Sequence, residues 1–177
     1  MLNHPIIALA FVAILASPVN SAEADDLVSP QEIIAKVKEA AAFLETAGEA
    51  GLMTFDSSDS PFVWKSTYVF VWDCGADAVV AHPVEGVGLK LSTLEDAAGK
   101  LMGPEMCKAA KRLDGGWVEY MWPKPLKVGD ADRLAYAETP SRKVTYMLSV
   151  KGQPYQVGAG DYNDSLTVPQ LDALLIE

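Results

Sequence analysis

The sequence predicts an α+β domain in which a long N-terminal helix covers an antiparallel sheet of five to six strands. Two observations lead to this fold class. One long stretch with helical periodicity comes first, and five segments rich in β-branched and aromatic residues follow it. Consecutive strands with short links must run antiparallel, and such a sheet with separate helices is an α+β arrangement.

The long helix is expected over residues 30–52. Ser29 and Glu32 make a capping box at its start, and Pro30 suits the first helical position. Apolar residues then recur at helical spacing, with most charged residues on the other side: Ile33, Ile34, Val37, Ala40, Ala41, Leu44 and Ala47. The turn-rich stretch 56–61 ends the helix.

The strand segments contain the residue types that favour extended backbone. The expected strands are residues 67–72, 78–82, 117–122, 142–150 and 155–162. Between and after them we expect a turn at 73–77, a loop at 83–103, a short helix at 104–112, a long hairpin loop at 123–140, a tight turn at 151–152 and a closing helix at 168–175. Pro123 and Pro125 are the reason for ending the third strand at residue 122, because proline lacks the N–H that a strand donates.

Composition excludes several functional classes. The chain has 177 residues and a formal net charge of -10, so it would repel the phosphate backbone of a nucleic acid. Two cysteines and two histidines are too few for a four-thiolate zinc site or for a site with several imidazoles. The sequence has no nucleophile elbow, phosphate loop, dinucleotide fingerprint or haem-attachment motif. We therefore expect no metal, no cofactor and no catalytic residue.

Residues 1–24 are expected to be a secretory signal peptide, and residues 25–177 a single mature domain. The apolar run 6–16 is too short to cross a bilayer, which needs ~20 residues, but it suits the core of a signal peptide. Small residues follow, and cleavage is expected between Ala22 and Asp25. The alternative is a buried N-terminal helix. Export predicts a periplasmic or secreted location, and we expect no membrane anchor because no second long apolar segment follows.

Export also changes the interpretation of the two cysteines. Cys74 lies in an expected turn and Cys107 in the expected short helix. In an oxidising compartment the two thiols can pair, and we predict a disulfide between them. The alternative is two buried free thiols.

Five segments form a pattern along the chain. They are Trp64–Val71, Ala81–Pro83, Gly115–Tyr120, Arg142–Tyr146 and Gly158–Tyr162. Their order and spacing resemble the single Cache domain, a PAS-like extracytoplasmic sensor module, over about residues 28–165. The resemblance implies a pocket on the sheet face away from the long helix, and ligands such as small carboxylates or amino acids. One departure is Asp161, where family members commonly carry an aliphatic residue.

Polar candidates for a ligand site lie at the ends of these strands. His82 could donate to a bound carboxylate or change charge with pH, or could simply bond to backbone at a strand end. Arg142 and Lys143 are adjacent cations that invite an anion in an acidic chain, or form a solvated pair beside nearby acidic residues. Only one of the two can face a pocket, because neighbours on a strand point to opposite sides. Asp161 could bind a ligand amine, or lie outward near the end of the sheet.

Aromatic side chains are also placed to line a pocket. Tyr68, Phe70 and Trp72 alternate along one strand and share a face, as do Tyr120 and Trp122 on another. A buried tyrosine hydroxyl needs a partner, which favours a pocket role for the tyrosines, whereas core packing is expected for Phe70 and Trp72. The expected ligand-binding set is Trp64, Tyr68, His82, Tyr120, Trp122, Arg142, Lys143, Tyr146 and Asp161.

These features together predict an exported, soluble, non-enzymatic sensor that binds a small organic acid or amino acid. Without an anchor, it would signal by docking onto a membrane receptor or kinase, or it would buffer its ligand. Two alternatives remain: an interaction or scaffold module with a degenerate pocket, and a small exported enzyme that uses His82 with a nearby carboxylate.

Overall fold

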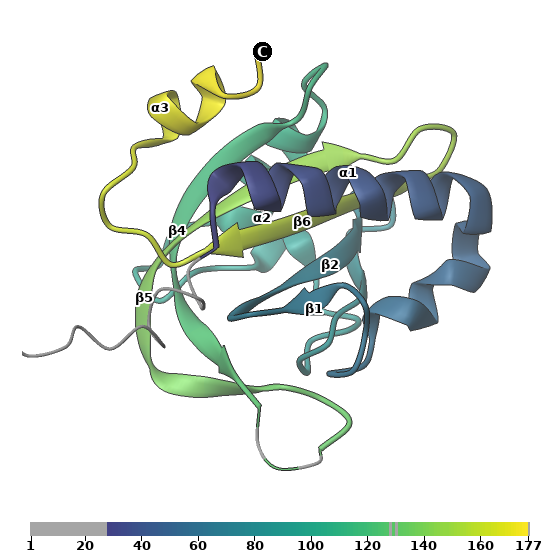
Figure 1. Ribbon diagram of the computed structural model, residues 1–177, viewed down its shortest axis with the longest axis horizontal. Helices are drawn as coiled ribbons and strands as arrows, with labels where there is room; N and C mark the ends of the chain where they lie inside the picture. Colours follow the sequence, from purple (N-terminus) through teal and green to yellow (C-terminus); the bar gives the residue numbers. More distant parts are fainter. Residues whose placement is uncertain (1–27, 128, 130, 177) are drawn as a thin grey trace, which may run out of the picture.

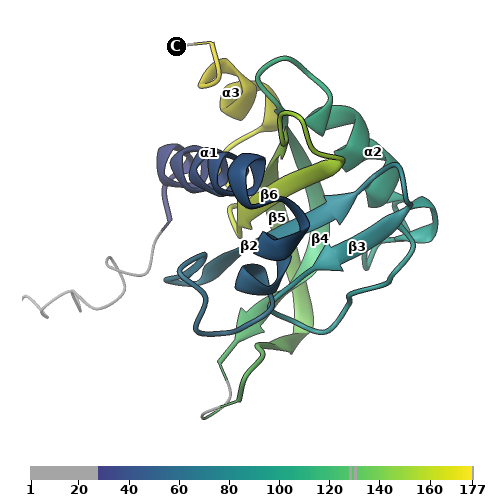
Figure 2. The same cartoon turned by 90° about the vertical axis from the view of Figure 1, so that its right-hand side faces the viewer.

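The structure is a computed structural model that describes residues 28–127, 129 and 131–176. An antiparallel sheet forms its centre, with α1 (Pro30–Ala47) lying across one face and α2 (Met102–Ala110) against the other (Figure 1 and Figure 2). The fold class is therefore the predicted one. The expected signal peptide, residues 1–24, lies outside the described residues.

The sheet has six strands within the described part of the chain. They are β1 (Val63–Trp64), β2 (Thr67–Asp73), β3 (Ala78–Ala81), β4 (Gly116–Leu126), β5 (Ala135–Ser149) and β6 (Tyr155–Asp161). Their order is β1-β2-β6-β5-β4, β3 also pairs with β2, and every pair is antiparallel. Two 3-10 helices and a closing helix complete the fold: η1 (Gly48–Phe55), η2 (Leu91–Thr93) and α3 (Val168–Ala173).

The long helix begins where the sequence predicts and ends earlier. The Glu32 N–H donates to Ser29 Oγ at 3.2 Å, which caps the first turn. The α-helix ends at Ala47 rather than at residue 52, because Gly48 adopts a φ of 54° and leaves the helical conformation. The chain then continues as η1, whose last residue, Phe55, is fully buried.

The predicted loop over residues 123–140 is wrong, because β4 and β5 extend through most of it. Pro123 lies opposite Pro140, and the register shifts between Pro123 and Pro125. Proline is tolerated here for two reasons. β4 is the edge of the sheet, and β5 pairs with β6 only from Val144 onward, so each proline has a single neighbouring strand.

Alternating side chains divide the sheet into two buried faces. The face under α1 includes Val69 and Val71 of β2, and the opposite face includes Tyr68, Phe70 and Trp72 of the same strand. α1 covers the first face with Ile33, Val37, Ala40, Ala41 and Leu44. α2 covers part of the second with Met102, Met106, Ala109 and Ala110.

A disulfide between Cys74 and Cys107 is present, as predicted. It joins the turn after β2 to α2 across a sequence separation of 33 residues. The bond therefore holds α2 against the sheet face opposite α1. In the part of the chain that the structure describes, no helix has the length and apolar character needed to span a membrane.

Candidate functional site

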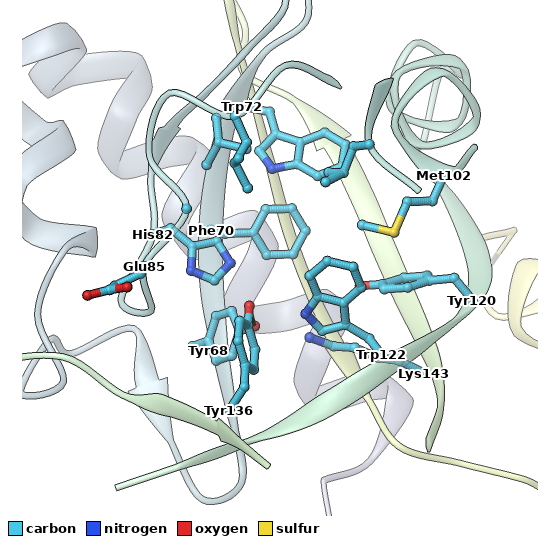
Figure 3. A pocket seen from close by; sticks show the side chains of 14 residues that line it. Tyr68, Phe70, Trp72, His82, Glu85, Met102, Tyr120, Trp122, Tyr136 and Lys143 are labelled. Atoms are coloured by element: carbon cyan, nitrogen blue, oxygen red, sulfur yellow. Dashed lines mark hydrogen bonds between the residues drawn. The ribbon is translucent and has the colours of Figure 1, made fainter. Parts of the chain in front are cut away.

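A small cavity lies on the sheet face opposite α1, between the sheet, α2 and the loop that follows β3 (Figure 3). About 40 Å³ of it is open to the centres of water molecules. Since one water needs ~10–15 Å³ by this measure, the cavity as it stands holds a molecule of a few non-hydrogen atoms. Its lining residues are Tyr68, Phe70, Trp72, Val79, His82, Glu85, Gly86, Leu89, Leu94, Met102, Tyr120, Trp122, Tyr136 and Lys143.

Aromatic rings form most of the wall. The Phe70 and Trp72 rings lie 5.3 Å apart, and the Trp122 and Tyr136 rings meet edge to face at 5.8 Å. Phe70 and Trp72 are buried, as expected of core residues, but they also line the cavity. β6 makes room for these rings, because a Cβ atom at Gly158 would stand 2.7 Å from the Phe70 ring.

Lys143 is the one lysine or arginine among the lining residues, and it is 1% exposed. Its Nζ lies 4.6 Å from the centre of the Tyr68 ring and 5.3 Å from that of Tyr162. Nζ has no hydrogen bond or ion pair with any of the described residues. Burial lowers the pKa of Lys143 to about 7, and the charge of Asp161 opposes this shift only in part.

His82 contributes a neutral imidazole. Its Nδ1 lies 3.1 Å from N and 3.2 Å from O of Val84, so Nδ1 accepts from the Val84 N–H in one tautomer and donates to the Val84 carbonyl in the other. The ring stacks on Phe70 at 5.7 Å. Burial, with Lys143 nearby, lowers the pKa of His82 to about 3. The imidazole is therefore uncharged near neutral pH, and it donates to a ligand through Nε2 in the tautomer in which Nδ1 accepts from Val84.

Three tyrosine hydroxyls border the cavity. Tyr68 and Tyr136 are hydrogen-bonded to each other at 3.1 Å, and Tyr120 is bonded to Thr145 at 2.9 Å. Burial raises the pKa of all three phenols, so they remain protonated. They can therefore orient a polar ligand as uncharged donors or acceptors.

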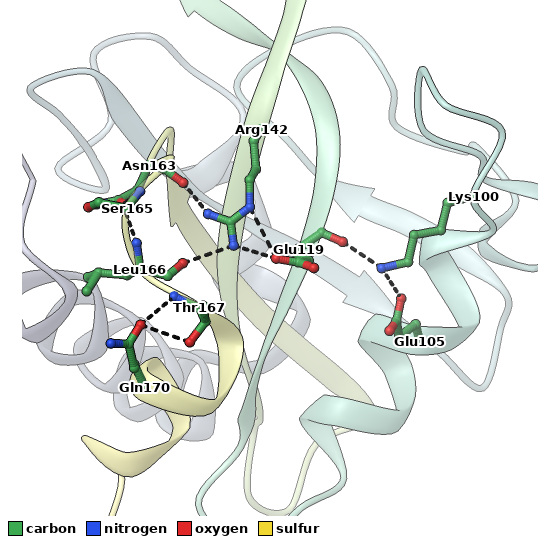
Figure 4. A network of polar contacts seen from close by, with 9 residues as sticks. All are labelled: Lys100, Glu105, Glu119, Arg142, Asn163, Ser165, Leu166, Thr167 and Gln170. Carbon is green, nitrogen blue, oxygen red and sulfur yellow. Dashed lines mark hydrogen bonds and ion pairs between the residues drawn. The ribbon is translucent and has the colours of Figure 1, made fainter.

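Arg142 points away from the cavity, so of the two adjacent cations, only one of which could face a pocket, Lys143 is the one that lines it. Its guanidinium pairs with Glu119 and donates to the carbonyl oxygens of Asn163 and Leu166 (Figure 4). The segment after β6 is thereby attached to the sheet. Adjacent strand residues point to opposite faces, and Lys143 is the one that faces the cavity.

Three other predicted site residues also lie elsewhere. Tyr146 belongs to the core under α1, where its hydroxyl donates to the Asp114 carbonyl at 2.7 Å. Trp64 packs against the same core. Asp161 is half-buried and, by strand alternation, shares the α1 face with Val144, its partner in register.

The structure also adds residues to the cavity that the sequence prediction omitted. Tyr136 lay in the stretch expected to be a loop, yet it belongs to β5. Met102 comes from α2, and Glu85, Gly86 and Leu89 come from the loop after β3. The sequence could have predicted that Phe70 and Trp72 also line the cavity. Every second residue of a strand faces the same side, so these two residues share the face of Tyr68.

The site as a whole suits a small anion. It offers a buried amine that has no ion pair among the described residues, a neutral imidazole and phenol hydroxyls, all inside apolar walls. Glu85 is the one acidic side chain in the lining, and it is exposed. No group of three or more metal-binding side chains occurs among the residues the structure describes.

Comparison with known families shows that the family model for single Cache domain 2 matches residues 8–146. Among solved structures, the chain is similar to a methyl-accepting chemotaxis protein from Vibrio parahaemolyticus RIMD 2210633, with 16% identity over 76% of this chain and 88% of that one and a TM-score of 0.57.

Two further structures resemble the chain. A periplasmic sensor domain of a chemotaxis protein shares 24% identity over 82% of this chain and 99% of its own, with a TM-score of 0.52. A Cache chemosensory domain described as recognising carboxylic acids shares 22% identity over 74% of this chain and 86% of its own, with a TM-score of 0.47.

Proposed function

The chain belongs to the single Cache domain 2 family, and from this premise we propose that it is an extracytoplasmic sensor domain that binds a small carboxylate at Lys143. The observation that carries the proposal is the buried Lys143 amine, which forms no ion pair with a described residue and which the charge of Asp161 compensates only in part. A buried charge is costly unless it is paired. A carboxylate in the cavity would form an ion pair with the Lys143 ammonium and so offset the cost of burying that charge.

The remaining lining residues support an anion over a cation. His82 Nε2–H and the phenol hydroxyls can donate to carboxylate oxygens, and the buried tyrosines stay uncharged because burial raises their pKa. The ammonium group of an amino acid would be repelled by Lys143, and the lining has no buried carboxylate to pair with it. This favours a simple organic acid over an amino acid as the ligand class.

The size of the cavity supports a short ligand. Formate, acetate and glycolate have three to five non-hydrogen atoms. A cavity of about 40 Å³ has room for about that many, because one water molecule needs ~10–15 Å³. Larger acids would require the loop after β3, with Gly86 and Leu89, to move away from the aromatic wall.

The route from ligand to signal is also part of the proposal. Export would follow from the signal peptide expected at residues 1–24, and a membrane receptor or kinase is the proposed partner. α2 lines the cavity through Met102 and is tied to the turn after β2 by the disulfide, so ligand entry would displace both elements together.

Thermal unfolding and calorimetry with formate, acetate and glycolate test the proposal. A ligand at a hundred times its dissociation constant should add ~2.7 kcal/mol of stability. Removal of one partner of a desolvated charge pair typically costs ~2–5 kcal/mol, so Lys143→Met should weaken binding about thirtyfold or more.

The matched control is Lys124→Met, which removes an exposed lysine whose Nζ lies 5.6 Å from the centre of the Tyr162 ring. This variant should bind like the wild type. Binding that survives in Lys143→Met, or no stabilisation of the wild type by any of the three acids, would contradict the anion site.

A further inference from the structure

We propose that Lys143 is a nucleophilic amine that captures a small aldehyde or 2-oxo acid as a reversible imine inside the cavity. The inference goes beyond the proposed function, because it adds a covalent step. It uses the same cavity but does not depend on carboxylate binding, since an uncharged aldehyde can react where no anion binds.

The surroundings of Lys143 favour the neutral amine. Nζ rests against the Tyr68 and Tyr162 rings and has no carboxylate within ion-pair distance among the described residues. The residue is 1% exposed, so bulk water solvates an ammonium poorly at this position. Lysines that are desolvated in an apolar pocket are the ones that proteins use to form Schiff bases.

The chemistry balances with the carbonyl compound alone. The Nζ lone pair attacks the carbonyl carbon, a C–N bond forms, and the carbonyl π pair moves to oxygen. Transfer of a proton from nitrogen to that oxygen gives a carbinolamine. Loss of the hydroxyl with a further proton from nitrogen then releases one water molecule and leaves the imine, so no oxidant or reductant is required.

The cavity provides what this reaction needs. In the hydrogen-bonded pair of Tyr68 and Tyr136 hydroxyls, one proton is used within the pair and the other remains for a ligand. This hydroxyl, and the His82 Nε2–H in the tautomer in which Nδ1 accepts from Val84, are uncharged donors suited to a carbonyl oxygen that gains negative charge. The 1% exposure of Lys143 limits the access of bulk water that would hydrolyse the imine. The volume of about 40 Å³ admits a carbonyl compound with a few non-hydrogen atoms.

Selectivity follows from the neutral fraction of each amine. An ordinary lysine with a pKa of ~10.4 is neutral in about one molecule in 2,500 at neutral pH. With its pKa lowered to about 7, Lys143 is neutral in about half of the molecules. Even if burial slows entry into the cavity a hundredfold, Lys143 should react about tenfold faster than a lysine of this ordinary kind.

Reductive trapping of the full chain provides the test. The protein is incubated at pH 7 with acetaldehyde and cyanoborohydride, and ethylated lysines are located by peptide mass analysis at several times. We expect Lys143 to be modified at least tenfold faster than Lys124, its exposed counterpart. The preference should disappear when the chain is unfolded in denaturant, because the unfolded lysines are equivalent.

Variants separate this inference from the proposed function. Lys143→Arg keeps a positive charge but has no nucleophilic amine, so it should lose the fast labelling, whereas Lys124→Arg should not. Acetate calorimetry on the wild type reports on the anion site independently. A parallel trapping reaction with glyoxylate shows whether the imine site takes an acidic carbonyl compound as well as an uncharged one.

The outcomes are distinct. Fast labelling of Lys143 by acetaldehyde or by glyoxylate supports the inference, and the compound that reacts identifies the class. Labelling of folded wild-type Lys143 no faster than that of Lys124 with both compounds overturns it. This comparison is made within one folded protein, so it holds even if Lys143→Arg does not fold.

Discussion

The Nζ atom of Lys143 lies 4.6 Å from the centre of the Tyr68 ring, so the amine in the cavity rests on an aromatic face instead of a carboxylate. A cation–π contact contributes ~0.5–2 kcal/mol, whereas desolvation of an ion costs several kcal/mol. Desolvation therefore dominates, and it accounts for the lowered pKa of Lys143. Lys143 is therefore a buried amine that lines the cavity and can contact a ligand there.

The stability of the wild type should increase with pH between about 7 and 10. The pKa of Lys143 is about 7 in the folded chain and ~10.4 when unfolded, so the unfolded chain binds more protons across this range. The free energy of unfolding should therefore rise by up to ~1.4 kcal/mol per pH unit. Urea unfolding from pH 7 to 9.5 measures this slope, before the buried tyrosines begin to titrate.

Lys143→Met should lack this contribution to the slope, while Lys124→Met should keep it. Lys143→Met should also be more stable than the wild type at pH 7, because a neutral side chain of similar length replaces an amine that is partly charged. Parallel stability curves for Lys143→Met and the wild type would show that Lys143 titrates normally.

Acetate affinity should decrease above pH 7. Binding requires the Lys143 ammonium, which is lost in the free protein as the pH rises through its pKa of about 7. The association constant should fall about tenfold per pH unit well above that pKa, and binding should take up close to one proton there. Calorimetry in two buffers with different ionisation enthalpies measures both quantities; an affinity that stays constant from pH 6 to 9 would rule out this linkage.

Arg142→Ala should release the segment after β6 without affecting ligand affinity. The guanidinium is bonded to Glu119 and to the carbonyl oxygens of Asn163 and Leu166, and it does not line the cavity. Hydrogen exchange in residues 163–176 should accelerate, while acetate binding stays within a factor of about two. The comparison with Lys143→Met is informative, because the two residues are neighbours on one strand. A large loss of affinity in Arg142→Ala would place the anion on the wrong face.

Loss of the disulfide should destabilise the fold. Its closed loop of 33 residues corresponds to ~3–4 kcal/mol on the chain-entropy model. Cys74→Ser with Cys107→Ser should unfold at lower temperature and lower urea concentration than the oxidised wild type. Reductant should move the wild type toward the double variant and leave the variant itself unchanged. Two free thiols in denatured, unreduced wild type would show that the bond does not form.

The sequence by itself determined the local structure. Ser29, Pro30 and Glu32 specified the start of α1, and the aromatic alternation over Tyr68, Phe70 and Trp72 specified a strand with these three residues on one face. These signals are local, because capping and side-chain alternation depend on a few consecutive residues. The five matching segments also pointed to the correct family.

Alternation was applied to Arg142 and Lys143 but was not extended along β5 to Tyr146. It puts Arg142 and Tyr146 on one face and Lys143 on the other, so Tyr146 could not share a pocket with Lys143. Pro123 led to the wrong expectation that the strand ends at residue 122, whereas β4 continues to Leu126. Proline ends a strand only where a neighbouring strand needs its N–H. The edge position of β4 is a property of strand order, and strand order is not local.

Only the tertiary structure decided which face of the sheet holds the cavity residues. Both faces of β2 are apolar, so its sequence alone does not indicate whether Val69 or Tyr68 lies under α1. That choice depends on how β2, β6 and β5 pair and on where α1 packs. The same long-range pairing buried Lys143 beside Tyr68, and the amine acquired its altered pKa from that burial. Local sequence sets which residues share a face, whereas the packing of distant segments sets what that face meets.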